Sequence, residues 1–162
     1  MSQSFVITLI VIAALLVFGA AVSFDVFSLN SAIKNGFNNN KKYPLTIEDT
    51  VIQVEVANTA VKRVIGLSER ESLPFDEGLL FVFNEPGKHP FWMKDMNFSI
   101  DIIWVNEHFF VVDVTEGIIP ATFPEIFEPI ERIKYVLEVN AGFVAKNSVQ
   151  RGTFVDGLRS IR

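Results

Sequence analysis

The fold is decided by the stretch Ile100-Asp-Ile-Ile-Trp-Val-Asn-Glu-His-Phe-Phe-Val-Val-Asp-Val114. Residues 100–105 and 109–114 are both rich in β-branched and aromatic side chains, and a short polar segment, Asn106-Glu-His108, separates them. Two runs of this kind joined by a few turn-forming residues are typical of a β-hairpin. We therefore predict two antiparallel strands that are joined by a tight turn.

Further short strands are expected on both sides of this hairpin. Val51–Val56 alternates apolar and polar residues, which indicates a half-buried strand. Gly78–Phe83 is a continuous apolar run that is typical of a buried strand. Other extended segments are expected at residues 91–93, 135–140 and 153–155, and short helices at residues 61–65 and 141–145. Six or seven short strands with little helix predict a mainly β fold, a single compact β-sandwich or barrel-like domain with one or two short helices.

The N-terminal segment has a different composition. No charged side chain occurs between Ser2 and Phe24, and apolar residues would cover every face of a helix over this stretch. About 20 such residues are needed to span a bilayer. A cleaved signal peptide is an alternative, because Gly19-Ala-Ala21 could be a cleavage site, although no basic residue precedes the apolar run. We predict a transmembrane helix over residues 1–24 that contacts the membrane through residues 5–24.

Two further segments complete the predicted organisation. Residues 25–44 are rich in Asn, Ser and Lys without sustained periodicity, which favours a flexible tether that ends near Pro44. Residues 45–162 are enough for one independent hydrophobic core and are predicted to form the soluble β-rich domain. This domain contains 18 acidic and 11 basic residues, a balance that disfavours binding to nucleic acid. The chain has no cysteine, so disulfides, thiol catalysis and cysteine zinc sites are excluded.

Several motifs occur in the order found in one known family. These are Arg63-Val-Ile-Gly-Leu67, Glu77-Gly-Leu-Leu-Phe-Val-Phe83, Phe91-Trp-Met-Lys94, Ile100-Asp-Ile-Ile103 and Tyr135-Val-Leu-Glu-Val-Asn-Ala-Gly142. Together they resemble the family called domain of unknown function 192, over roughly residues 51–153. The resemblance implies a compact β domain, often behind an export or anchor segment, and no established activity. Three lysines after the helix favour a cytoplasmic domain, but the export segment that the resemblance implies outweighs them, so we expect a membrane-anchored, extracytoplasmic domain.

The candidate site predicted from the sequence centres on Trp92. Its ring could offer a flat apolar platform for a sugar or peptide, while the adjacent Lys94 and Asp95 could fix the ligand's orientation. The alternative is that Trp92 and Met93 belong to the core and that the charged pair is a solvated turn.

Asp101 is the second candidate, because it stands among isoleucines in a strand that should be buried. An ionised carboxylate needs a partner there, and Arg63, Arg70 or Lys94 could supply one. A structural ion pair is favoured over a ligand-binding or catalytic acid. Arg63 and Arg70 could also clamp an anionic ligand, although arginines more often hold a loop to carboxylates such as Asp76 and Glu77.

No motif in the sequence identifies a reaction or a cofactor. The two histidines lack ligand spacing, so no metal site is expected, and the sequence contains no nucleophile elbow or phosphate-binding loop. The leading hypothesis is a non-enzymatic, membrane-tethered binding or accessory domain at the cell envelope, with a glycan, a peptide or an envelope protein as its partner. The alternatives are an envelope hydrolase that uses Asp101 with a second carboxylate, such as Glu138, and a structural component of an assembly.

Overall fold

The computed structural model describes residues 41–161. The predicted transmembrane helix over residues 1–24 and most of the predicted tether lie outside this part of the chain. Within residues 41–161, no helix has both the length and the apolar character needed to cross a bilayer.

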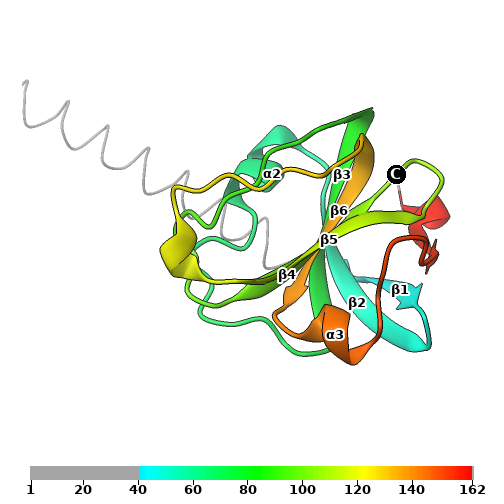
Figure 1. Cartoon of the computed structure of the whole chain (residues 1–162), viewed down its shortest axis with the longest axis horizontal. Helices are drawn as coiled ribbons and strands as arrows, with labels where there is room; N and C mark the ends of the chain where they lie inside the picture. The colour runs from blue at the N-terminus through cyan, green and yellow to red at the C-terminus, as the bar shows by residue number, and fades with distance from the viewer. Residues whose placement is uncertain (1–40, 162) are drawn as a thin grey trace, which may run out of the picture. The chain divides into compact units, whose positions relative to one another are not determined.

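In residues 41–161, seven strands form one strongly curled sheet, a half-barrel (Figure 1). The strand order is β5-β4-β6-β3-β2-β1-β7, and only β2 and β3 pair in parallel. The strands are β1 Tyr43–Ile47, β2 Thr50–Ala57, β3 Glu77–Gly87, β4 Ile100–Val105, β5 Val111–Ile118, β6 Ile133–Asn140 and β7 Val155–Asp156. The short helices are α2 Ala60–Ile65, η1 Pro120–Thr122, α3 Phe143–Lys146 and η2 Leu158–Ser160. The prediction of a mainly β domain with short helices is therefore confirmed.

The predicted hairpin is β4 and β5, which pair antiparallel. Its turn is fixed by Asn106, whose side-chain Oδ1 accepts hydrogen bonds from the backbone N–H groups of His108 and Phe110. Asn side chains favour turns because they can replace a backbone acceptor in this way. The first residue of β5 also bonds to a distant segment. The backbone of Val111 bonds to that of Gly152 and Thr153, which brings the start of β5 close to the segment that leads into β7.

The sequence did not indicate β1, and it indicated one strand that the structure lacks. The strand β1 begins at Tyr43, before the predicted domain boundary at Leu45, and contains Pro44, a residue that disfavours sheet interiors. In the predicted 91–93 strand, only Phe91 pairs, through a single bridge with Phe127. Both β1 and residues 91–93 are short segments. Contacts with distant parts of the chain, rather than the local sequence pattern, determine whether each one forms a strand.

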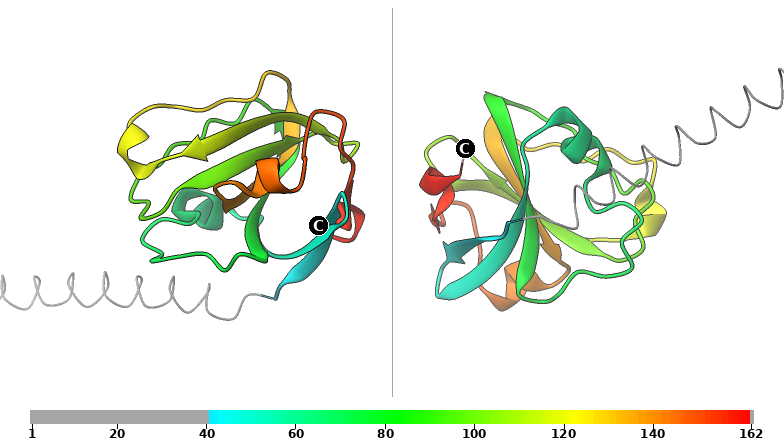
Figure 2. Two further views of the ribbon diagram at one scale, coloured as in Figure 1. Left: turned by 60° about the horizontal axis from the view of Figure 1, so that its bottom comes forward. Right: turned by 180° about the vertical axis from the view of Figure 1, so that it is seen from behind.

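Both faces of the central strands are buried, because the sheet separates two hydrophobic clusters. In β6, Leu137 and Val139 belong to the cluster inside the curl, together with Ile103 of β4. Val136 belongs to the cluster on the outer face, together with Trp104. Figure 2 shows α2 and the loops near residue 120 on one side of the sheet, with β1 and α3 on the other. A single curled sheet thus replaces the two packed sheets of a sandwich.

The strand register brings four side chains into one row across the outer face. Glu55 of β2 stands opposite Leu79 of β3, Leu79 opposite Glu138 of β6, and Glu138 opposite Ile102 of β4. Two acidic residues that are far apart in the sequence therefore lie on the same face, separated by one strand.

Candidate ligand pocket

A pocket of about 410 Å³ lies on the outer face of the sheet, over β3 and β6. Its walls are α2 with the residues that follow it and the loop after β3. Aromatic and aliphatic side chains dominate the lining, which includes Leu67, Phe81, Phe83, Phe91, Trp92, Met96 and Ile126. Three ionisable side chains also line it, namely Arg63, His89 and Glu138. A concave, mostly apolar pocket with a few polar groups has the usual composition of a small-molecule site.

Glu138 is the polar group on the floor of this pocket. Its side chain is 5% exposed, and no described residue donates a hydrogen bond to its Oε2. Burial raises the pKa of Glu138 from an ordinary value of 4.5 to about 8, and the positive charge of Arg70 opposes this rise. At pH 7 the group is therefore mainly the neutral carboxylic acid, which can donate a hydrogen bond.

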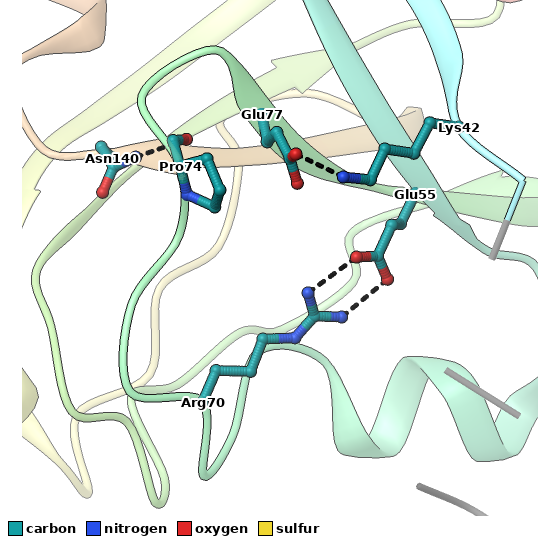
Figure 3. Close-up of polar contacts among 6 residues, drawn as sticks. All are labelled: Lys42, Glu55, Arg70, Pro74, Glu77 and Asn140. Atoms are coloured by element: carbon teal, nitrogen blue, oxygen red, sulfur yellow. Dashed lines mark hydrogen bonds and ion pairs between the residues drawn. The ribbon is translucent and has the colours of Figure 1, made fainter. Parts of the chain in front are cut away.

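Arg70 forms a bidentate ion pair with Glu55, the other acid of the row. Figure 3 shows the guanidinium reaching from its loop to the carboxylate, with Nη1 at 2.9 Å from Oε1 and Nη2 at 2.8 Å from Oε2. In the same view, Lys42 bonds to Glu77, and Asn140 donates to the carbonyl oxygen of Pro74. Arg70 is paired with Glu55, and its positive charge also favours the ionised form of Glu138.

The mouth of the pocket contains a stacked group of side chains. The ring of His89 lies parallel to Phe83, with a distance of 3.6 Å between ring centroids. The guanidinium carbon of Arg63 lies 5.2 Å from the centroid of Phe83, and its Nη1 donates to the carbonyl oxygen of Val82 at 2.9 Å. A cation over an aromatic face is attracted to the ring's electrons. These contacts fix the wall of the pocket near α2.

The residues at its two ends explain where α2, the helix that contributes Arg63, begins and ends. Its N-cap is Thr59, whose side chain accepts a hydrogen bond from the backbone N–H of Lys62. It ends at Gly66, whose positive φ of 54° is a conformation that favours glycine. A Cβ atom at this position would stand 3.4 Å from the ring of Phe81, an ordinary van der Waals contact, so the positive φ rather than a lack of space explains the glycine.

The structure places the sequence-predicted site residues in different environments. Trp92 is 56% exposed at the rim of the pocket, whereas the neighbouring Met93 is buried. Arg63 lines the pocket, and Arg70 is held by Glu55. Lys94 and Asp95 form an exposed ion pair with each other and are not part of the lining. Trp92 and Arg63 are thus brought to one pocket, and the charged pair is not.

The predicted ion pair of Asp101 does not form. Asp101 is fully buried, but its Oδ1 accepts a hydrogen bond from the backbone N–H of Gly117 at 2.8 Å, and its Oδ2 accepts one from that of Val144 at 3.0 Å. Two backbone amides therefore replace the expected Arg63, Arg70 or Lys94. Hydrogen bonds to the charged form stabilise a buried carboxylate as a cation does. Asp101 joins β4, the end of β5 and α3.

Asp101 and Glu138 lie on opposite faces of the sheet. Asp101 stands opposite Val139, and Ile102 stands opposite Glu138. Since consecutive residues of a strand point to opposite faces, the two carboxyl groups are separated by the sheet itself. The two acids named for a hydrolase therefore do not meet in one cleft. Within residues 41–161, no group of three or more acidic or histidine side chains is placed to hold a metal ion.

The sequence pattern did not identify Glu138 as a residue of the pocket. The alternation of its strand points Glu138 away from Leu137 and Val139, towards a face that in many strands meets water. In this domain the loops and α2 cover the second face, so the same alternation places the acid in a second apolar cluster. An acid within Tyr135–Val139, a run of otherwise apolar residues, was the available signal.

Two solved structures are similar to this chain. A proposed transcription regulator from Sinorhizobium meliloti 1021 is 27% identical with a TM-score of 0.69, covering 74% of this chain and 95% of its own. A protein of unknown function from Novosphingobium aromaticivorans DSM 12444 is 27% identical with a TM-score of 0.68, covering 71% of this chain and 84% of its own.

The family comparison agrees with the resemblance that the motifs indicated. No curated protein matches the sequence. The family model for domain of unknown function 192 (DUF192), described as an uncharacterised ACR, matches residues 43–157, which is more than half of the chain. This range contains all the strands of the described residues, β1 to β7, and all the residues of the pocket. The chain belongs to the DUF192 family.

Proposed function

We propose that this domain binds an uncharged small molecule, or a peptide side chain, that has an apolar body and one hydrogen-bond acceptor. The observation that carries the proposal is Glu138, a buried carboxyl group without a donor to its Oε2 on the floor of an apolar pocket. A buried polar group without a partner costs free energy, and proteins retain few of them. A ligand that bonds to Glu138 would recover this cost when it binds.

The protonation state of Glu138 selects the ligand. With the pKa raised to about 8, the neutral acid donates a hydrogen bond at pH 7 to a carbonyl, ether or hydroxyl oxygen. An anionic ligand would also lose its hydration on entering this mostly apolar pocket, which costs more free energy than the burial of an uncharged ligand. The aromatic lining, with Phe81 and Phe91 edge to face at 4.8 Å between centroids, would pack against the apolar body of the ligand.

The proposal includes a location at the cell envelope, with the domain tethered to a membrane and outside the cytoplasm. It is supported by the uncharged stretch from Ser2 to Phe24 and by the lack of any catalytic motif in the sequence. A hydrolase that uses Asp101 is disfavoured, because both oxygens of that carboxylate are engaged by backbone amides. A binding role needs no second acid.

Acetophenone and isopropylbenzene provide a matched pair of probes, because they have the same number and connectivity of heavy atoms and a methyl group of the second replaces the carbonyl oxygen of the first. The domain, residues 41–162, would be labelled with ¹⁵N and titrated with each probe at the same concentrations at pH 6.5. We expect shifts at amides around the pocket, with acetophenone binding at least threefold more tightly than isopropylbenzene. In Glu138→Leu the two probes should bind equally, because the donor is gone while the apolar surface remains.

Two controls separate the role of Glu138 from general damage to the fold. Asp95→Asn changes an exposed acid outside the pocket and should leave both affinities unchanged. Equal binding of the two probes by the unmodified domain would contradict the proposed role of Glu138. Shifts confined to residues away from the pocket would contradict the site itself.

A further inference from the structure

Five large apolar side chains surround the mouth of the pocket and are exposed to solvent. We call them the apolar rim, and they are Val61, Val64, Trp92, Phe123 and Ile126. Val64 is 81% exposed, and both Trp92 and Ile126 are 56% exposed. Single apolar residues on a surface are common, whereas a cluster at the opening of an apolar pocket indicates a contact surface.

The rim is continuous because its residues come from three adjoining segments. Val64, Trp92 and Ile126 all line the pocket. The bridge between Phe91 and Phe127 sets Trp92 beside Ile126, and the ring of Phe123 meets that of Trp92 edge to face at 6.4 Å between centroids. Val61 lies one helical turn before Val64, so both are on the same side of α2.

We infer that the apolar rim docks on the surface of a zwitterionic lipid bilayer, so that the pocket opens towards the acyl-chain region. Trp side chains are favoured at the membrane interface, and several apolar neighbours around one Trp would insert together. The excess of acidic residues in the domain would repel anionic lipids, which is why the inference specifies zwitterionic ones.

The length of the chain before the domain supports a bilayer as the occupant. Residues 25–40 connect the uncharged stretch Ser2–Phe24 to the domain, and a segment of this length reaches at most about 55 Å. A domain held so near a bilayer meets its surface at high effective concentration. The inference rests on the proposed function, since the membrane tether is part of that proposal, and it adds that the ligand of the pocket enters from the membrane.

The two tryptophans allow a direct test with the domain, residues 41–162, which contains no part of the uncharged stretch. Trp104 is fully buried and Trp92 is exposed, so quenching by brominated acyl chains reports on Trp92. We expect the domain to float with phosphatidylcholine vesicles, the Trp emission to shift to shorter wavelength, and brominated phosphatidylcholine to quench it. The double variant Val61→Ser with Phe123→Ser removes two rim residues that do not line the pocket, and its vesicle affinity should fall at least tenfold.

The matched control is Phe75→Ser, which removes an exposed apolar residue at the opposite end of β3. Phe75 is 89% exposed and precedes Glu77, the first residue of β3. Glu77 lies about 20 Å along the strand from Phe83, which lines the pocket. It should bind vesicles as the unmodified domain does. Equal loss in both variants, or no flotation of the unmodified domain, would overturn the inference.

Self-association would also overturn it, if light scattering showed a dimer that Trp92→Ser dissociates and that binds no vesicles. Failure of the docking inference would leave the acetophenone titration unaffected, because that experiment contains no lipid. Conversely, loss of acetophenone binding with intact vesicle binding would reject the proposed function alone.

Discussion

The two buried acids of the central strands have opposite environments although they lie in paired strands. Asp101 accepts two hydrogen bonds from backbone amides inside the curl of the sheet. Glu138 stands one register position away on the other face, and its Oε2 accepts none from the described residues. The difference teaches that burial alone does not identify a functional acid. The hydrogen-bond partners of the acid and its access to a pocket distinguish a structural role from a binding role.

The largest expected effect is the loss of stability in Asp101→Ala. This substitution leaves the backbone N–H groups of Gly117 and Val144 buried without their acceptor, and each such group costs about 1–3 kcal/mol. We expect the free energy of unfolding to fall by about 3–5 kcal/mol, measured by urea denaturation. Asp101→Asn keeps one acceptor and should lose about half as much. A loss of less than about 1 kcal/mol in Asp101→Ala would contradict the structural role of Asp101.

The second expected effect is a pH dependence that comes from Glu138. Its folded-state pKa is raised to about 8 from 4.5, so between these values the folded protein holds a proton that the unfolded chain has lost. The free energy of unfolding should therefore decrease as the pH rises from about 5 to 8, by about 1 kcal/mol per pH unit. The measurement is the difference between the unmodified domain and Glu138→Gln at each pH, because the other titrating groups then cancel. A difference that does not change with pH would contradict a buried, neutral acid.

A smaller effect with the opposite sign is expected from Glu138→Leu. Leucine fills a similar space without an unpaired polar group, so the free energy of unfolding at pH 7 should rise by about 1 kcal/mol. Residues that serve function are often not optimal for stability, and this gain would come with the loss of preference for acetophenone. A destabilised Glu138→Leu variant would instead show that Glu138 supports the fold, as Asp101 does.

The smallest effect is expected at the exposed pair Lys94 and Asp95, which the sequence placed beside Trp92 in the candidate site. Exposed ion pairs contribute about 0–1 kcal/mol, because water solvates both partners. Lys94→Ala should change the free energy of unfolding by less than about 0.5 kcal/mol and leave probe binding unchanged. A clear loss of acetophenone binding in this variant would extend the site beyond the pocket.

The fold was largely predictable because its strands carry strong local patterns. The β4–β5 hairpin was identified from its turn residues, β2 from the alternation of apolar and polar residues, and β3 from its continuous apolar run. The sequence could not show that one sheet curls and that loops cover its outer face, because this depends on contacts between distant segments. The candidate site was less predictable for the same reason. Trp92 was identified by its type, whereas Glu138 gained importance only once both faces of β6 were known to be buried.

The protonation of Glu138 is the central claim, because the ligand class and the pH dependence both follow from it. The direct measurement is the ¹³C chemical shift of the Glu138 side-chain carboxyl group, followed in the domain from pH 4 to pH 10 and assigned with Glu138→Gln. The structure predicts a transition with a pKa of about 8 and a protonated carboxyl at pH 7. A transition near the ordinary value of 4.5 would contradict the account, since an ionised Glu138 could not donate a hydrogen bond in the pocket.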